Sequence, residues 1–117
     1  MAEANRTAYE GMVWLPGTEQ LLVKLTLFLD QENREVSLNM DESSGCSTTW
    51  VGVNVHLSSS GLVFQTQGLP SKDRTLWWML RRAEDGLVGL INTLPDEHGM
   101  WNQSTVSLSH DRPATNP

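Results

Sequence analysis

Apolar and polar residues alternate along most of this chain. In the segment 35–41 the apolar positions are Val36, Leu38 and Met40, and the residues between them are polar. The segment 51–57 repeats the pattern, with valine or leucine at the odd positions and Gly, Asn and His at the even ones. Because successive side chains of a β-strand point to opposite faces, this period of two predicts antiparallel strands with one buried face.

Short clusters of Gly, Pro, Asp, Asn and Ser separate the alternating runs and predict turns. Residues 75–86 could also be read as a short helix, but their two tryptophans and their threonine favour a strand. We therefore predict about nine strands and no helix, and we leave open whether the last two form one strand. The predicted strands are Ala8–Leu15, Leu21–Asp30, Glu35–Asp41, Trp50–Leu57, Leu62–Gly68, Thr75–Arg82, Leu87–Thr93, Met100–Gln103 and Ser104–His110.

Short strands joined by short turns predict an all-β protein that forms a single antiparallel up-and-down β-barrel of about 8–10 strands. Such a sheet must close to hide its edges, although a β-sandwich is the alternative because turn spacing does not separate the two. A length of 117 residues fits one domain, 1–117, with frayed termini at about 1–7 and 111–117. The expected core is Val36, Leu38, Met40, Val51, Val53, Val55, Leu62 and Phe64.

Three of the predicted strands are apolar on both faces, which a sheet with one wet face does not explain. They contain the segments 21–29, 76–80 and 87–91. In the second segment Trp77 and Trp78 are adjacent, so they must point to opposite faces. We expect one of them to pack in the barrel and the other to lie in the subunit contact of a homodimer, because cyclic dimers commonly cover such apolar patches.

Several short motifs follow one another along the chain: "GMVWL", the Ser/Gly loop "DESSGC", "GLVF", "DGLVG" and the closing "WNQSTVSL". In this order they resemble calycin-type small barrels and are similar to the lipocalin-like β-domains that accompany some hydrolases. The resemblance covers nearly the whole chain. It implies an up-and-down barrel whose open end and lumen hold an apolar small molecule.

Two fragments, "TTWVG" and "TLWWML", are similar to parts of avidin-like barrels. The spacing between them departs from that family. The polar residues that contact biotin in that family cannot be matched one by one in this sequence. We therefore infer no biotin site from the similarity.

The net charge is −6, with only eight Lys and Arg residues, which argues against nucleic acid and against an anionic membrane surface as partners. No signal-like segment and no apolar run of membrane-spanning length is present, so we expect a cytoplasmic protein. The three histidines fall on different predicted elements, and the only cysteine, Cys46, lies in a polar loop. We expect no metal, no cofactor and no disulfide.

The most prominent polar candidates lie on the predicted strand 50–57, where Trp50, Asn54 and His56 share one face. If this face lines a lumen, these side chains are the polar anchors of an apolar pocket, and His56 is positioned to act as a general acid or base. In the alternative orientation the valines point inward and His56 lies in solvent.

The pair Arg81 and Arg82 ends the predicted strand 75–82, with one side chain on each face. One arginine could close the mouth of the barrel and meet a ligand anion or stack on a tryptophan. Five tryptophans in a short chain add large aromatic surfaces for a ligand. The predicted ligand-binding residues are Trp50, Asn54, His56, Trp77, Trp78, Arg81 and Trp101, and His56 is the predicted catalytic residue.

Three functions remain open at this point. The first is a barrel that binds an apolar or aromatic small molecule in its lumen. The second is a lipocalin-like cyclase or isomerase of natural-product biosynthesis, which would act mainly by holding a flexible substrate in a reactive shape. The third is a protein-interaction module that uses the doubly apolar strands.

Overall fold

The computed structural model describes residues 6–16, 21–42, 45, 47–67, 75–93, 98–99 and 102–110. This part of the chain holds nine strands and no helix. In chain order the strands are β1 (Arg6–Leu15), β2 (Leu21–Asp30), β3 (Glu35–Glu42), β4 (Ser47–Val51), β5 (Val53–Leu57), β6 (Gly61–Gln67), β7 (Thr75–Ala83), β8 (Gly86–Thr93) and β9 (Gln103–His110).

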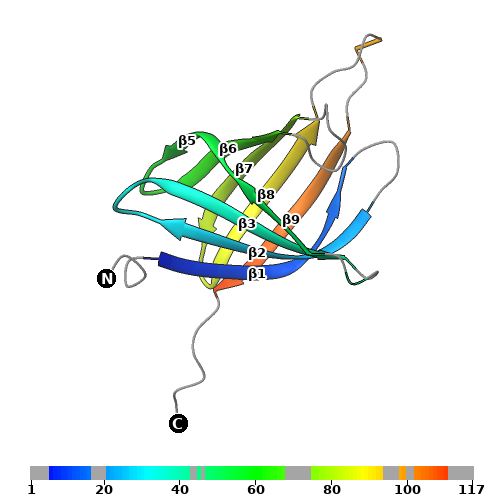
Figure 1. Cartoon of the computed structure of the whole chain (residues 1–117). Helices are drawn as coiled ribbons and strands as arrows, with labels where there is room; N and C mark the ends of the chain where they lie inside the picture. The colour runs from blue at the N-terminus through cyan, green and yellow to red at the C-terminus, as the bar shows by residue number, and fades with distance from the viewer. Residues whose placement is uncertain are drawn as a thin grey trace.

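All nine strands belong to one antiparallel sheet with the order β4-β3-β2-β1-β9-β8-β7-β6-β5. The two outer strands of this order, β4 and β5, are consecutive along the chain, so the sheet curls into a nearly closed barrel. Figure 1 shows β1, β2 and β3 crossing in front of β7, β8 and β9 around a common interior. The predicted all-β up-and-down barrel is confirmed, and the β-sandwich alternative is wrong because there is a single sheet.

One predicted strand, Trp50–Leu57, is wrong, because the chain breaks it at Gly52. The N–H of Gly52 donates to the carbonyl of Val36 at 2.9 Å, which ends the pairing of β4 with β3. The next strand, β5, pairs instead with β6, and its register shifts between Val53 and His56. Asn54 lies inside this shift with a φ of 53°, a left-handed conformation that Asn tolerates better than most residues. A bent and bulged strand therefore closes the barrel.

The bulge at Asn54 changes which side chains point inward. Trp50 is partly buried and packs against the core, whereas Asn54 and His56 are exposed. The prediction that these three residues share one face is therefore wrong. The prediction that Val51 belongs to the core is also wrong, because 66% of its surface is exposed.

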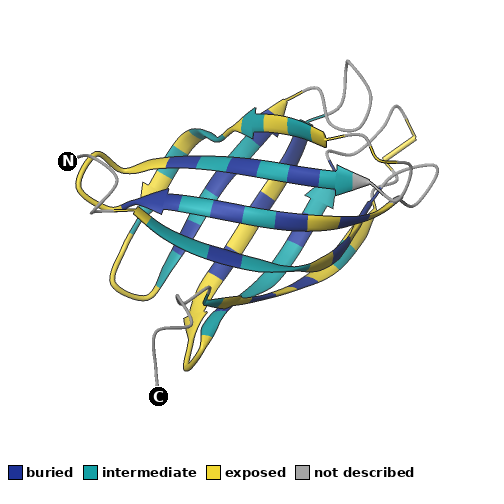
Figure 2. Cartoon of the chain, turned by 60° about the horizontal axis from the view of Figure 1, so that its bottom comes forward, coloured by how far each residue is buried: buried dark blue, intermediate teal, exposed yellow. Residues whose placement is uncertain are grey.

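The interior of the barrel is filled mainly by apolar side chains, which form one core cluster. Figure 2 shows buried residues alternating with less buried ones along the strands. Of the eight predicted core residues, Val36, Leu38, Met40, Leu62 and Phe64 are buried, as predicted. Further buried residues come from β1, β2, β7, β8 and β9, among them Val13, Leu25, Leu27, Leu76, Trp78, Ile91 and Leu108.

The two adjacent tryptophans of β7 separate as their alternation predicts. Trp78 is fully buried, stacks on Phe64 with ring centroids 5.5 Å apart, and donates its indole N–H to the hydroxyl of Thr66 at 2.9 Å. Trp77 points to the outer face and is 36% exposed. Trp78 is therefore a core residue, and Trp77 lies on the surface of this chain.

Among the described residues, the end of the sequence holds one strand, β9, which agrees with the alternative that the last two predicted strands are one. Gln103 is the first residue of β9, so it belongs to the same strand as Ser104. Met100 and Trp101, which complete the predicted strand Met100–Gln103, lie outside the described residues.

Candidate functional site

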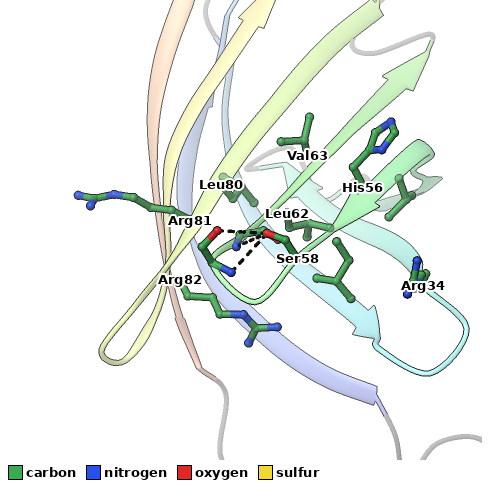
Figure 3. Close-up of a pocket in the computed structure, with 12 residues that line it drawn as sticks. Arg34, His56, Ser58, Leu62, Val63, Leu80, Arg81 and Arg82 are labelled. Atoms are coloured by element: carbon green, nitrogen blue, oxygen red, sulfur yellow. Dashed lines mark hydrogen bonds between the residues drawn. The ribbon is translucent and has the colours of Figure 1, made fainter.

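An open pocket of about 690 Å³ lies at the end of the barrel where the β5–β6 hairpin turns. Figure 3 shows this region, with side chains contributed by several hairpins of the same end. The lining residues come from the β2–β3 turn, from β5, β6 and the turn between them, and from β7. They include the apolar residues Val55, Leu57, Leu62, Val63 and Leu80, the polar residues Ser58 and Ser60, and the basic residues Arg34, Arg81 and Arg82.

The floor of the pocket is aliphatic and continuous with the core. Leu62 and Leu80 are buried and lie opposite each other in the β6–β7 pairing. Leu57 lies opposite Leu62 in the β5–β6 pairing, and Val55 and Leu57 are partly buried against the core. An apolar ligand in this pocket would therefore cover side chains that the barrel leaves only partly shielded.

Hydrogen bonds hold the rim of the pocket in one shape. The hydroxyl of Ser58 accepts from the backbone N–H of Ser60 at 3.3 Å and of Gly61 at 3.2 Å. The backbone N–H of Ser58 donates to the carbonyl of Gly61 at 2.9 Å, and that of Arg82 donates to the carbonyl of Ser60 at 2.9 Å. A rim fixed in this way loses little conformational freedom when a ligand binds.

The charged side chains that line the pocket have one sign. Arg34, Arg81 and Arg82 line it, and no Asp or Glu is among the lining residues that the structure describes. The whole chain has fourteen acidic residues and eight Lys and Arg residues. The positive charge of the three arginines that line the pocket is therefore opposite in sign to the net charge of the chain. In Figure 3 the side chains of Arg34 and Arg82 lie on opposite sides of Ser58 and Leu62, whereas Arg81 points away from them.

Arg34 has an unusual backbone conformation at the end of the β2–β3 turn. Its φ is 54°, in the left-handed region that favours glycine. The turn itself is held by Asn33, whose side-chain amide donates to the Asp30 carboxylate at 2.9 Å and whose backbone N–H donates to it at 3.1 Å. These two hydrogen bonds lower the pKa of Asp30 below its ordinary value. The turn is thus defined by other residues and presents Arg34 at the pocket.

Two of the predicted site residues, His56 and Arg81, line the pocket. Both are exposed, and Figure 3 shows His56 on the side of the site near Val63. Asn54 does not line it and instead donates its side-chain amide to Gln65 at 2.9 Å on the outer surface. Asn54 therefore supports the bulge of β5.

The predicted tryptophans do not line this pocket in the described part of the chain. Trp78 is packed in the core, and Trp77 lies on the outer face of β7. Trp50 faces the interior, where its indole N–H is buried without a hydrogen-bond partner among the described residues. Trp101 lies outside the described residues.

Of the basic residues that line the pocket, Arg34 was not selected from the sequence, and Arg82 was considered only as one of two arginines that could close the mouth. The alternation of β7 did indicate that Arg81 and Arg82 point to opposite faces, and Arg82 follows Leu80 on the inner side. Arg34 carried no such signal, because its place depends on a left-handed turn and on how β3 approaches β5.

The fold and the pocket define the chain as an antiparallel up-and-down β-barrel with an arginine-bordered opening of mixed apolar and polar lining at one end. This architecture is compatible with the calycin-like resemblance. No family model, no curated protein and no solved structure matches the chain. Among the described residues, no three His, Cys, Asp or Glu side chains gather in a way that could hold a metal ion, and no helix has the length and hydropathy of a membrane span.

Proposed function

We propose that this chain is a small-molecule-binding barrel that takes an apolar or aromatic ligand at the mouth formed by β5, β6 and β7. The observation that carries the proposal is the pocket of about 690 Å³ with an aliphatic floor and a hydrogen-bonded rim. Ligand pockets typically measure roughly 300–1,000 Å³ and combine apolar walls with a few placed polar groups. Covering the floor with a ligand would remove exposed aliphatic surface from water, which favours binding.

Substitution of Val55 by tryptophan should fill the mouth and weaken binding of the neutral fluorophore N-phenyl-1-naphthylamine by more than about tenfold, equivalent to about 1.4 kcal/mol. Val55 lines the pocket and is only partly buried, so the larger side chain extends into the open space. The matched control is Val51→Trp, because Val51 is exposed and does not line this pocket. Direct excitation of the dye measures its affinity for each variant.

Far-UV circular dichroism shows whether the Val55→Trp variant keeps its sheet, and Val55→Phe serves if it does not. Equal affinity of the wild type and the folded Val55 variants would contradict the proposed site. Absence of saturable binding to the wild type would contradict the proposed function.

A cyclase or isomerase on the same frame is the second candidate function. The observation in its favour is that His56 lines the pocket, where an imidazole can transfer a proton to or from a bound substrate. Native mass spectrometry of the protein from its own source separates the two candidates. A binding protein returns its retained ligand unchanged after incubation, whereas an enzyme converts it.

We also propose that two copies of the chain associate through an outer patch formed by Val63, Trp77, Met79 and Leu90. Val63 pairs with Met79, and Met79 pairs with Leu90, so these side chains are neighbours across β6, β7 and β8. Trp77 and Met79 are 36% and 39% exposed. The patch contains no charged residue, which suits a symmetric contact between two chains that each carry a net charge of −6.

Replacement of Trp77 by glutamate should convert the dimer into a folded monomer, because symmetry would place two like charges in one apolar contact. Sedimentation velocity measures the change. Met12→Glu is the matched control, since Met12 is 60% exposed on β1, outside the patch. A wild type that is monomeric at high micromolar concentration would refute self-association.

A further inference from the structure

We infer that the ligand of the pocket is an amphiphilic anion, with an apolar body on the aliphatic floor and an acidic group held between Arg34 and Arg82. This inference rests on the proposed function and names the chemical class of its ligand. It starts from the distribution of charge. A chain with a net charge of −6 borders its pocket with three arginines and, among the lining residues that the structure describes, with no carboxylate.

The arginines are available for an external anion. Arg34, Arg81 and Arg82 make no ion pair with another residue in the described part of the chain. Glu32, Glu84 and Asp85 belong to the neighbouring turns and Glu35 begins β3, but none of them lines the pocket. A guanidinium offers five N–H donors in a planar fork that matches a carboxylate or a sulfonate. Two arginine side chains can therefore hold one acidic group from two sides.

The backbone of Arg34 supports a role for its side chain. The φ of Arg34 is 54°, and this left-handed conformation is less favourable for arginine than for glycine, which has no Cβ. Residues other than glycine with such a conformation are frequent at binding sites. The turn is already held by the hydrogen bonds between Asn33 and Asp30. The side chain of Arg34 is therefore not required to hold the turn, whereas it lines the pocket and brings a positive charge there.

The position of Arg82 is also well defined. Its backbone N–H is bonded to Ser60 of the neighbouring hairpin, and its side chain follows the inward-facing Leu80 by two residues along β7. In Figure 3, Leu62 and Ser58 lie between Arg82 and Arg34, so the acidic group would sit above the apolar floor. Arg81 points away from this position, and we expect it to contribute less.

The test compares two probes that share one aromatic skeleton. The dye 8-anilinonaphthalene-1-sulfonate carries a sulfonate, and N-phenyl-1-naphthylamine lacks it. We expect the wild type to bind the sulfonate with one-site saturation and about tenfold more tightly than the neutral probe. The preference should shrink as salt concentration rises, because the arginines are near solvent.

Arg34→Gly and Arg82→Gln should each weaken sulfonate binding by about fivefold, the upper range for an exposed charge contact, and should weaken binding of the neutral probe by less. The glycine variant should lose no thermal stability, because glycine fits the left-handed φ. Lys24→Gln is the control with the same change of charge, since Lys24 is exposed on β2 and does not line the pocket.

The possible results are distinguishable. Loss of the sulfonate preference in both arginine variants, but not in Lys24→Gln, would establish the anion site. Equal binding of the two probes to the wild type and all variants would refute the anion site while leaving the pocket as a binding site. Absence of saturable binding of either probe would refute the proposed function and this inference together.

Discussion

Replacement of Trp78 by alanine is expected to cost about 3–5 kcal/mol, the range observed when a fully buried large aromatic side chain is removed. Trp78 has no exposed surface, stacks on Phe64, and satisfies the hydroxyl of Thr66 in the interior of the barrel. The loss would consume much of a total stability of about 5–15 kcal/mol. Urea denaturation followed by far-UV circular dichroism measures the change.

The control for this experiment is the neighbouring residue. Trp77→Ala removes the same side chain from the outer face, where Trp77 is 36% exposed, so we expect the free energy of unfolding of the monomer to change by less than about 1 kcal/mol. Denaturation at low protein concentration separates this effect from self-association. Comparable losses in the two variants would contradict the assignment of Trp78 to the core and Trp77 to the surface.

Replacement of Gly89 by alanine is the second large effect that we expect, although it adds a single methyl group. A Cβ at this position would lie 2.0 Å from the carbonyl oxygen of Met79 and 2.9 Å from the Cα of Leu80. Both atoms belong to the backbone of β7, so the clash cannot be relieved by turning a side chain. We expect a destabilisation at the upper end of the roughly 1–3 kcal/mol that overpacking costs.

Gly52→Ala is the matched comparison for Gly89. A Cβ at Gly52 would meet side-chain atoms, the nearest being an aromatic carbon of Phe64 at 3.0 Å. A side chain adjusts more readily than a paired backbone, so this variant should be the more stable of the two in thermal denaturation. A Gly89→Ala variant as stable as the wild type would show that β7 and β8 are not held as closely as their pairing indicates.

The arrangement of strands could be predicted because it follows from local pattern. The alternation of Val36, Leu38 and Met40 specifies an extended segment and its buried face without knowledge of the neighbouring strand. The double apolarity of β7 likewise required Trp77 and Trp78 to point in opposite directions. Which of them points inward depends on pairing, because Trp78 lies opposite Phe64 and Ile91, and both of these residues are buried.

The candidate site could be predicted only in part. His56 and Arg81 were selected from the sequence and line the pocket, whereas Arg34 was not. The lining residues extend from Arg34 to Arg82 along the chain, and their assembly depends on the β2–β3 turn meeting β5, β6 and β7 at one end of the barrel. The spacing of these residues in the sequence does not predict their assembly, because the assembly follows from strand order and register.

The sequence by itself determined the all-β class, the approximate strands and most of the buried face, because alternation and turn chemistry are local properties. Only the tertiary structure decided the orientation of β4 and β5. The register shift around the left-handed Asn54 moves the inward positions from Trp50 before it to Val55 and Leu57 after it, so that Val51 is exposed. The physical reason is that closing a barrel bends one strand between two neighbours, and a bulge of one residue moves every later side chain to the other face.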